Sequence, residues 1–236
     1  MARTKMTRHE LKEQDEITTW LQRLTGVVIV WKNEIIIGAS ALLLIVLGIV
    51  GWNIYSSRRN ASAQSQLAQA IQIFDDTTRP DKERYEQTIA EARKTYDKYR
   101  SLPTGAIAEY YIAMSEDGLG QTPKAIEDLQ QTIQRGDPGI KAVAQFALAG
   151  VYGRHGETKK AIELYKQLYD SGAYSKAAVA YELASLYEAN KQADEAKNYY
   201  QKLVTEFPES PFRQNADEAL KRLGAPPAPA PAQKPS

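Results

Sequence analysis

Two stretches decide the fold: FALAGVYGRHGETKKAIELYKQLY at residues 146–169 and YELASLYEANKQADEAKNYYQKLV at residues 181–204. Aligned without gaps, they match at a constant offset of 35 residues. The matching pairs are Leu148/Leu183, Ala149/Ala184, Tyr152/Tyr187, Ala161/Ala196, Tyr165/Tyr200 and Leu168/Leu203. A third copy, YYIAMSEDGLGQTPKAIEDLQ, lies 36 residues earlier and aligns through Ile112, Ala113, Gly120, Ala125 and Leu129. A fixed period of this length predicts an array of helical repeats.

The sizes of the matching residues predict a helical hairpin in each copy. Alanines allow the two helices to approach closely, and the leucines and tyrosines fill the seam around them. Gly156 and residues 189–191 occupy the turns, and Pro208 ends the last hairpin. One hairpin cannot bury its apolar face alone, so the hairpins must stack on one another.

These residues resemble the tetratricopeptide repeat. The small residue of its first helix is met by Ala149 and Ala184, and its closing proline by Pro208. There are two departures: Glu116 stands where the first helix should carry an aromatic residue, and Lys191 replaces the turn glycine. The resemblance implies an all-α solenoid with three repeats over residues 106–209 and a degenerate hairpin over 58–105.

The end of the chain predicts a capping helix over residues 210–224. Ser210 is expected as its N-cap, Pro211 at its first helical position and Gly224 as its C-cap. The Pro/Ala-rich composition of residues 225–236 predicts a disordered tail.

Residues 35–57, IIIGASALLLIVLGIVGWNIYSS, contain no charge and predict a transmembrane helix. A helix of this length reaches about 35 Å, against a hydrocarbon core of about 30 Å. A buried helix of a soluble domain would show a polar face, which this segment lacks. A signal peptide is the other alternative, with ASA at residues 61–63 as its cleavage site. The apolar run is too long for one, and 34 residues precede it.

The basic residues around this segment favour a cytoplasmic N-terminus. Six lie before the segment and two directly after it, although the count is equal within twenty residues of each end. We therefore expect a cytoplasmic tail over residues 1–34 and a periplasmic C-terminal domain in the inner membrane, a cytoplasmic domain being the alternative. An apolar stripe over residues 17–31 predicts an amphipathic helix that lies on the membrane or packs against a partner protein.

Composition and motifs argue against an enzyme. Cysteine is absent, two histidines are present, and the formal net charge is +1. The sequence contains no phosphate-binding loop, nucleophile elbow or cluster of metal ligands. We expect no catalytic residue, cofactor or metal, and neither a nucleic acid nor a small molecule as the partner.

The repeat family implies a groove for partner peptides along the first helices. Its fifth helix position carries an aromatic residue in all three copies: Tyr110, Phe146 and Tyr181. The neighbouring groove positions carry Ile107, Met114, Val143, Gly150, Arg154, Ser185 and Glu188. The basic residue and asparagine with which some family members clamp a carboxylate are absent from these positions. An apolar segment or a partner helix is the expected ligand, unless these aromatic residues pack between repeats.

The order of short tail, single span and repeats resembles the bacterial family of ancillary Sec-translocon subunits over most of residues 20–224. That resemblance implies an accessory role in protein translocation or periplasmic chaperone networks, with the translocon, exported clients or chaperones as partners. The alternative is a scaffold for envelope or cell-division complexes that binds no clients.

Overall fold

The computed structural model describes residues 32–225, which fall into two compact units that divide between Arg59 and Asn60. The regular elements of these residues are all helices. The amphipathic helix expected over residues 17–31 lies outside the described residues, and so does the tail beyond Ala225.

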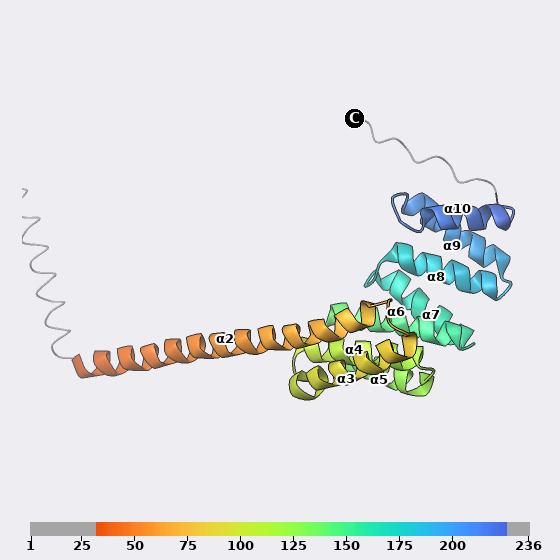
Figure 1. Cartoon of the computed structure of the whole chain (residues 1–236). Coiled ribbons are helices and arrows are strands. Elements are labelled where there is room, and N and C mark those ends of the chain that lie inside the picture. The colour runs from red at the N-terminus through yellow and green to blue at the C-terminus, as the bar shows by residue number, and fades with distance from the viewer. Residues whose placement is uncertain (1–31, 226–236) are drawn as a thin grey trace, which may run out of the picture. The chain divides into compact units, whose positions relative to one another are not determined.

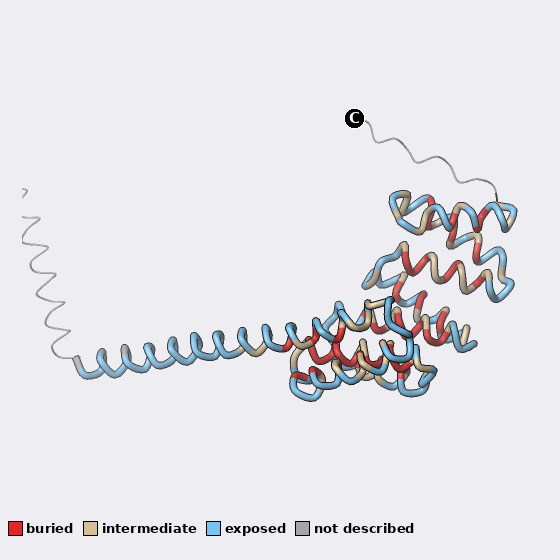
Figure 2. Tube along the Cα trace, in the orientation of Figure 1, coloured by how far each residue is buried: buried red, intermediate tan, exposed pale blue. Residues whose placement is uncertain are grey.

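The first unit contains the N-terminal part of helix α2 (Lys32–Asp75), which continues unbroken into the second unit. Thirteen large apolar side chains between Ile36 and Tyr55 are exposed, from 46% at Val46 to 72% at Trp52. Figure 2 shows this exposure along the helix. By length and composition, α2 is the one helix within residues 32–225 that is apolar and long enough to cross a membrane.

The second unit, described for residues 60–225, is a succession of helices that pack on their neighbours in the chain (Figure 1). Three hairpins, α4/α5, α6/α7 and α8/α9, correspond to the three predicted repeats, and α10 packs on α9. This arrangement confirms the predicted α-solenoid. The bounds are α3 (Asp81–Tyr99), α4 (Pro103–Gly118), α5 (Thr122–Arg135), α6 (Pro138–Arg154), α7 (Thr158–Ser171), α8 (Lys176–Ala189), α9 (Ala193–Glu206) and α10 (Arg213–Arg222).

The residues that recur between repeats form the core of the second unit. Ala149, Ala184 and their partners on the second helices, Ala161 and Ala196, are all 0% exposed. The recurring leucines and tyrosines are buried as well, at 7% exposure or less: Leu148, Tyr152, Tyr165, Leu168, Leu183, Tyr187, Tyr200 and Leu203. The seam predicted from residue size is therefore confirmed.

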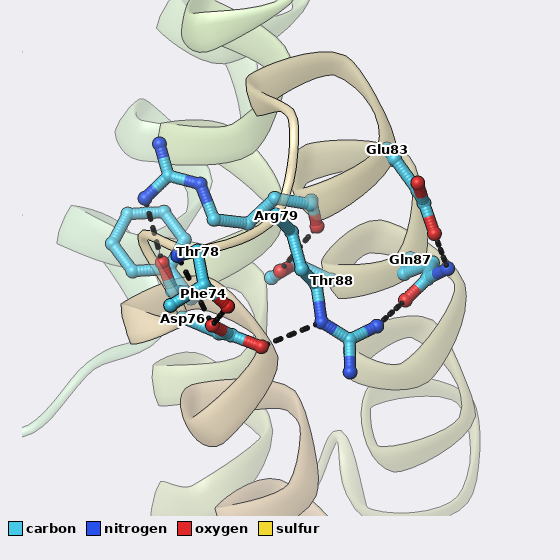
Figure 3. A network of polar contacts seen from close by, with 8 residues as sticks. Phe74, Asp76, Thr78, Arg79, Glu83, Gln87 and Thr88 are labelled. Carbon is cyan, nitrogen blue, oxygen red and sulfur yellow. Dashed lines mark hydrogen bonds and ion pairs between the residues drawn. The ribbon is translucent and has the colours of Figure 1, made fainter.

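A polar network holds the turn between α2 and α3 (Figure 3). The Asp76 carboxylate accepts hydrogen bonds from the Thr78 hydroxyl at 2.5 Å and from Arg79 Nε at 2.7 Å. These two bonds lower the pKa of Asp76 to about 2. Arg84 of α3 donates to the Phe74 carbonyl of α2 at 3.0 Å. Helices α2, α3 and α4 share one small core of Leu67, Ala70, Ala92, Ala108 and Ile112.

The repeat turns and the end of α10 share one helix-ending geometry. The amide after the left-handed residue bonds back to a carbonyl five residues earlier, as in Glu157 N to Tyr152 O at 2.8 Å. Glycine supplies the left-handed conformation at Gly120, Gly156 and Gly224. In the last repeat Lys191 adopts it, with φ at 60°. A side chain with a Cβ is strained in this region, whereas glycine is not.

Replacing Lys191 by glycine is expected to raise the free energy of unfolding by about 0.5–1 kcal/mol, because the strain of a left-handed lysine is removed. Thermal or urea unfolding followed by circular dichroism measures this gain. The matched control is Gln192→Gly at the next residue, where φ is −96°. It should not gain stability, because glycine adds chain entropy to the unfolded state and removes the hydrogen bond that Asn190 Nδ2 donates to Gln192 Oε1. A Lys191→Gly variant that is no more stable than the wild type would contradict the prediction.

The start of the capping helix differs from the prediction. We expected Ser210 as the N-cap, but the regular helix begins at Arg213 with Phe212 as its N-cap residue, so that prediction was wrong. Ser210 Oγ instead accepts from the Phe212 amide at 3.2 Å, inside a separate turn. The phenyl ring of Phe212 stacks on Tyr181, with centroids 5.1 Å apart.

Glu116 occupies the position of the buried tyrosines Tyr152 and Tyr187 in the other repeats. It is 4% exposed, and its Oε2 atom has no hydrogen-bond partner. Its nearest cation is Arg93, 3.8 Å from Oε1. Burial raises the pKa of Glu116 above its ordinary value. The ionised carboxylate therefore costs stability at neutral pH, and that cost disappears when the group is protonated below its ordinary pKa.

Replacing Glu116 by glutamine is expected to raise the free energy of unfolding by about 1 kcal/mol at pH 7, because it removes a buried charge whose desolvation Arg93 offsets only in part. The gain should shrink as the pH falls through the raised pKa and vanish near pH 4. Urea unfolding at several pH values measures it. The control is Glu86→Gln, an exposed carboxyl on α3, which should change little. An equal gain at every pH would show that charge is not the cause.

Candidate protein-interaction groove

The first helices of the three repeats line a hollow of about 390 Å³, which we call the central pocket. Its position was expected from the repeat family, since six of the predicted groove residues line it together. These six are Tyr110, Met114, Phe146, Gly150, Arg154 and Ser185. Gly150 and Gly153 lie along its α6 wall, and a Cβ added at Gly150 would approach Arg154 Nη1 to 3.2 Å and the Tyr165 hydroxyl to 3.3 Å.

Three aromatic side chains, those of Tyr110, Phe146 and Tyr165, line the central pocket. The ring of Phe146 packs edge-on against Tyr165 at 5.3 Å and stacks on Tyr174 at 4.4 Å. Tyr110 packs edge-on against Tyr111 at 5.3 Å. Burial raises the pKa of Tyr110 to about 12 and that of Tyr165 still further, so both phenols keep their protons at neutral pH.

Two charged side chains line the central pocket, and one of them already has a strong partner. Arg154 Nη2 lies 2.6 Å from the Asp117 carboxylate, which also contacts His155 Nε2 at 3.1 Å. The Glu182 carboxylate makes no hydrogen bond to any residue that the structure describes. Its pKa is raised by burial, and Arg154 offsets that effect only in part.

Four predicted groove residues lie elsewhere. Tyr181 stacks on Phe212 of the segment before α10. Glu188 accepts from the Tyr200 hydroxyl at 3.0 Å and pairs with Arg222 of α10 at 2.7 Å. Ile107 packs against the core of α2 and α3, and Val143 is half-buried outside the pocket lining. Tyr181 and Glu188 therefore join the last repeat to α10 and the segment before it.

Sequence reasoning missed Glu182 and treated Tyr165 only as core. Tyr165 is buried in the seam and also lines the central pocket, a double position that the repeat period does not reveal. Glu182 follows the fifth helix position directly, outside the groove pattern. Its signal was a single carboxylate within the otherwise apolar first turns of α8, AAVAYELAS.

Another depression, of about 750 Å³, lies where the α6–α7 and α8–α9 turns meet. Its wall includes the polar residues Glu157, Lys159, Lys160, Asn190 and Gln192. It lies away from the predicted groove residues. Within residues 32–225, no group of three or more histidine or carboxylate side chains is placed to hold a metal ion.

Comparison with known proteins identifies the family. The model of the tetratricopeptide repeat-like domain matches residues 30–225, and the chain belongs to this family. None of the curated proteins matches the sequence.

Solved structures share the fold. The chain resembles the nearly identical TPR-like repeats of a Podosopora anserina protein described as a kinesin light chain, with 20% identity and a TM-score of 0.56 over 68% of this chain and 84% of that one. A second crystal structure of that protein, in a variant form, gives 21% identity and a TM-score of 0.55 over the same shares. BtubC from P. vanneervenii has 14% identity and a TM-score of 0.48, over 76% of this chain and 97% of its own. At such identities, the two Podosopora structures show the fold alone.

Proposed function

We propose that the chain is a membrane-anchored protein-interaction module of the bacterial inner membrane that assists protein translocation or periplasmic chaperones. The observation that carries the proposal is the aromatic central pocket on a tetratricopeptide-like solenoid. The exposed apolar half of α2 supports the anchor. A pocket held at a membrane meets membrane-associated partners at a raised effective concentration, without any new contact.

Photocrosslinking in cells tests the client-binding role. A benzoylphenylalanine is placed at Ser185, which lines the central pocket, and at Gln201, an exposed residue of α9, as the control. We expect Ser185 alone to capture many newly synthesised exported chains, and the captured set to decline when synthesis is stopped. One or two stable stoichiometric partners would instead support the alternative, an envelope or division scaffold.

A reporter fusion tests the topology. Alkaline phosphatase, which is active only after export, is fused after Gly224, beyond α10. The proposal expects an active fusion and an inactive cytosolic reporter at the same site. Activity of the cytosolic reporter alone would place the repeats in the cytoplasm and overturn the periplasmic localisation.

A further inference from the structure

We propose that the central pocket receives a cationic side chain, lysine or arginine, from an otherwise apolar partner segment, with Glu182 as its counter-ion. This inference rests on the proposed protein-binding role and specifies the chemistry of the ligand. A pocket of about 390 Å³ lies within the usual range for binding sites, roughly 300–1,000 Å³.

The charges around the central pocket favour a cation. Arg154 is paired with Asp117 at 2.6 Å, so its positive charge is already engaged. The carboxylates of Asp117 and Glu182 together carry two negative charges against the one positive charge of Arg154. An anionic ligand would meet the unpaired Glu182 carboxylate, whereas a cation would neutralise it.

The surroundings of Glu182 also disfavour a neutral apolar side chain. A neutral group that fills the central pocket would strip water from the Glu182 carboxylate and leave it without a partner among the described residues. Burying an unpaired charge in this way is strongly unfavourable. An ammonium or guanidinium group supplies the missing hydrogen bonds at the same moment as it displaces the water.

The aromatic walls suit the same ligand. Phe146, Tyr110 and Tyr165 line the pocket, and the faces of such rings attract cations. The hydroxyls of Tyr110 and Tyr165 form no hydrogen bond with the residues described, so each can accept one from a ligand. The aliphatic stem of a lysine or arginine packs on apolar surface while its charged end reaches a carboxylate.

Three fluorescein-labelled peptide pools test the inference with the full chain in detergent micelles. The peptides are ten residues long, their flanks vary among Ala, Leu, Phe and Ser, and the central residue is lysine, norleucine or glutamate. Fluorescence anisotropy gives the affinity of each pool. We expect the lysine pool to bind about tenfold more tightly than the norleucine pool and the glutamate pool to bind most weakly.

Two variants identify the residue responsible. Glu182→Gln should reduce the preference for lysine over norleucine to near unity, by weakening the binding of the lysine pool without lowering the affinity for norleucine. Glu163→Gln, an exposed carboxyl on α7, should leave the preference unchanged. Equal binding of the lysine and norleucine pools by the wild type would overturn the cation inference alone. Failure of all three pools to bind would overturn the inference together with the proposed apolar groove.

Discussion

Replacing Leu183 by alanine is expected to lower the free energy of unfolding by about 3 kcal/mol. Leu183 is 0% exposed and belongs to the core that joins the last repeat to α7 and α10. Its truncation removes buried methyl groups and leaves a cavity, because close-packed neighbours relax only in part. In a solenoid each repeat depends on contacts with its neighbours, so the loss should spread from α8 to α7 and α10.

Urea unfolding of the full chain in detergent, followed by circular dichroism at 222 nm, measures this loss. The matched control is Leu186→Ala on the same helix, where the leucine is only half-buried and lines the central pocket. We expect the control to lose less than half as much. Similar losses for the two variants would show that α8 is not packed as the burial of Leu183 requires.

Arginine at both Leu44 and Leu47 is expected to release the chain from membranes. These leucines are 70% and 57% exposed within the apolar half of α2. Each arginine near the centre of a spanning helix costs about 2.5–3.5 kcal/mol on the insertion scale. Together they oppose insertion by about 6 kcal/mol, which is more than a ten-thousandfold change in the partition between membrane and water.

Fractionation of cells followed by alkaline extraction of the membranes measures the partition. The control carries arginine at Gln64 and Ser65, which are exposed on the same helix beyond the apolar segment. It should remain in the membrane pellet like the wild type. A Leu44/Leu47 double variant that also stays there would refute α2 as the anchor.

The repeat seam could be predicted from the sequence because it depends on local spacing. Ala149 and Ala184 hold the same position in their two repeats, and each is fully buried. The two residues that depart from the repeat pattern still keep the backbone geometry of the repeat. Lys191 adopts the turn conformation of the missing glycine, and Glu116 is buried where an aromatic residue was expected. The backbone packing of a repeat therefore tolerates single substitutions that break its pattern.

The groove was harder to predict, since neighbours outside the repeat decide which positions stay open. Tyr181 holds the same repeat position as Phe146, yet Phe212 covers it because α10 follows only the last repeat. Glu188 is engaged by Arg222 for the same reason. Glu182 was missed because its role depends on the absence of a hydrogen-bond partner, and a sequence alone does not show partners.

Helix α10 also affects which surfaces are free for contacts between molecules. Ala216, Ala219 and Leu220 bury one face of α10 against the last repeat. Without that cover, the apolar side of α8 and α9 would match the surface by which successive repeats dock, and repeats of another molecule would fit there. Head-to-tail contacts of that kind form rings where the rotation between molecules closes and open filaments where it does not. By occupying this face, α10 keeps it from taking part in such head-to-tail contacts.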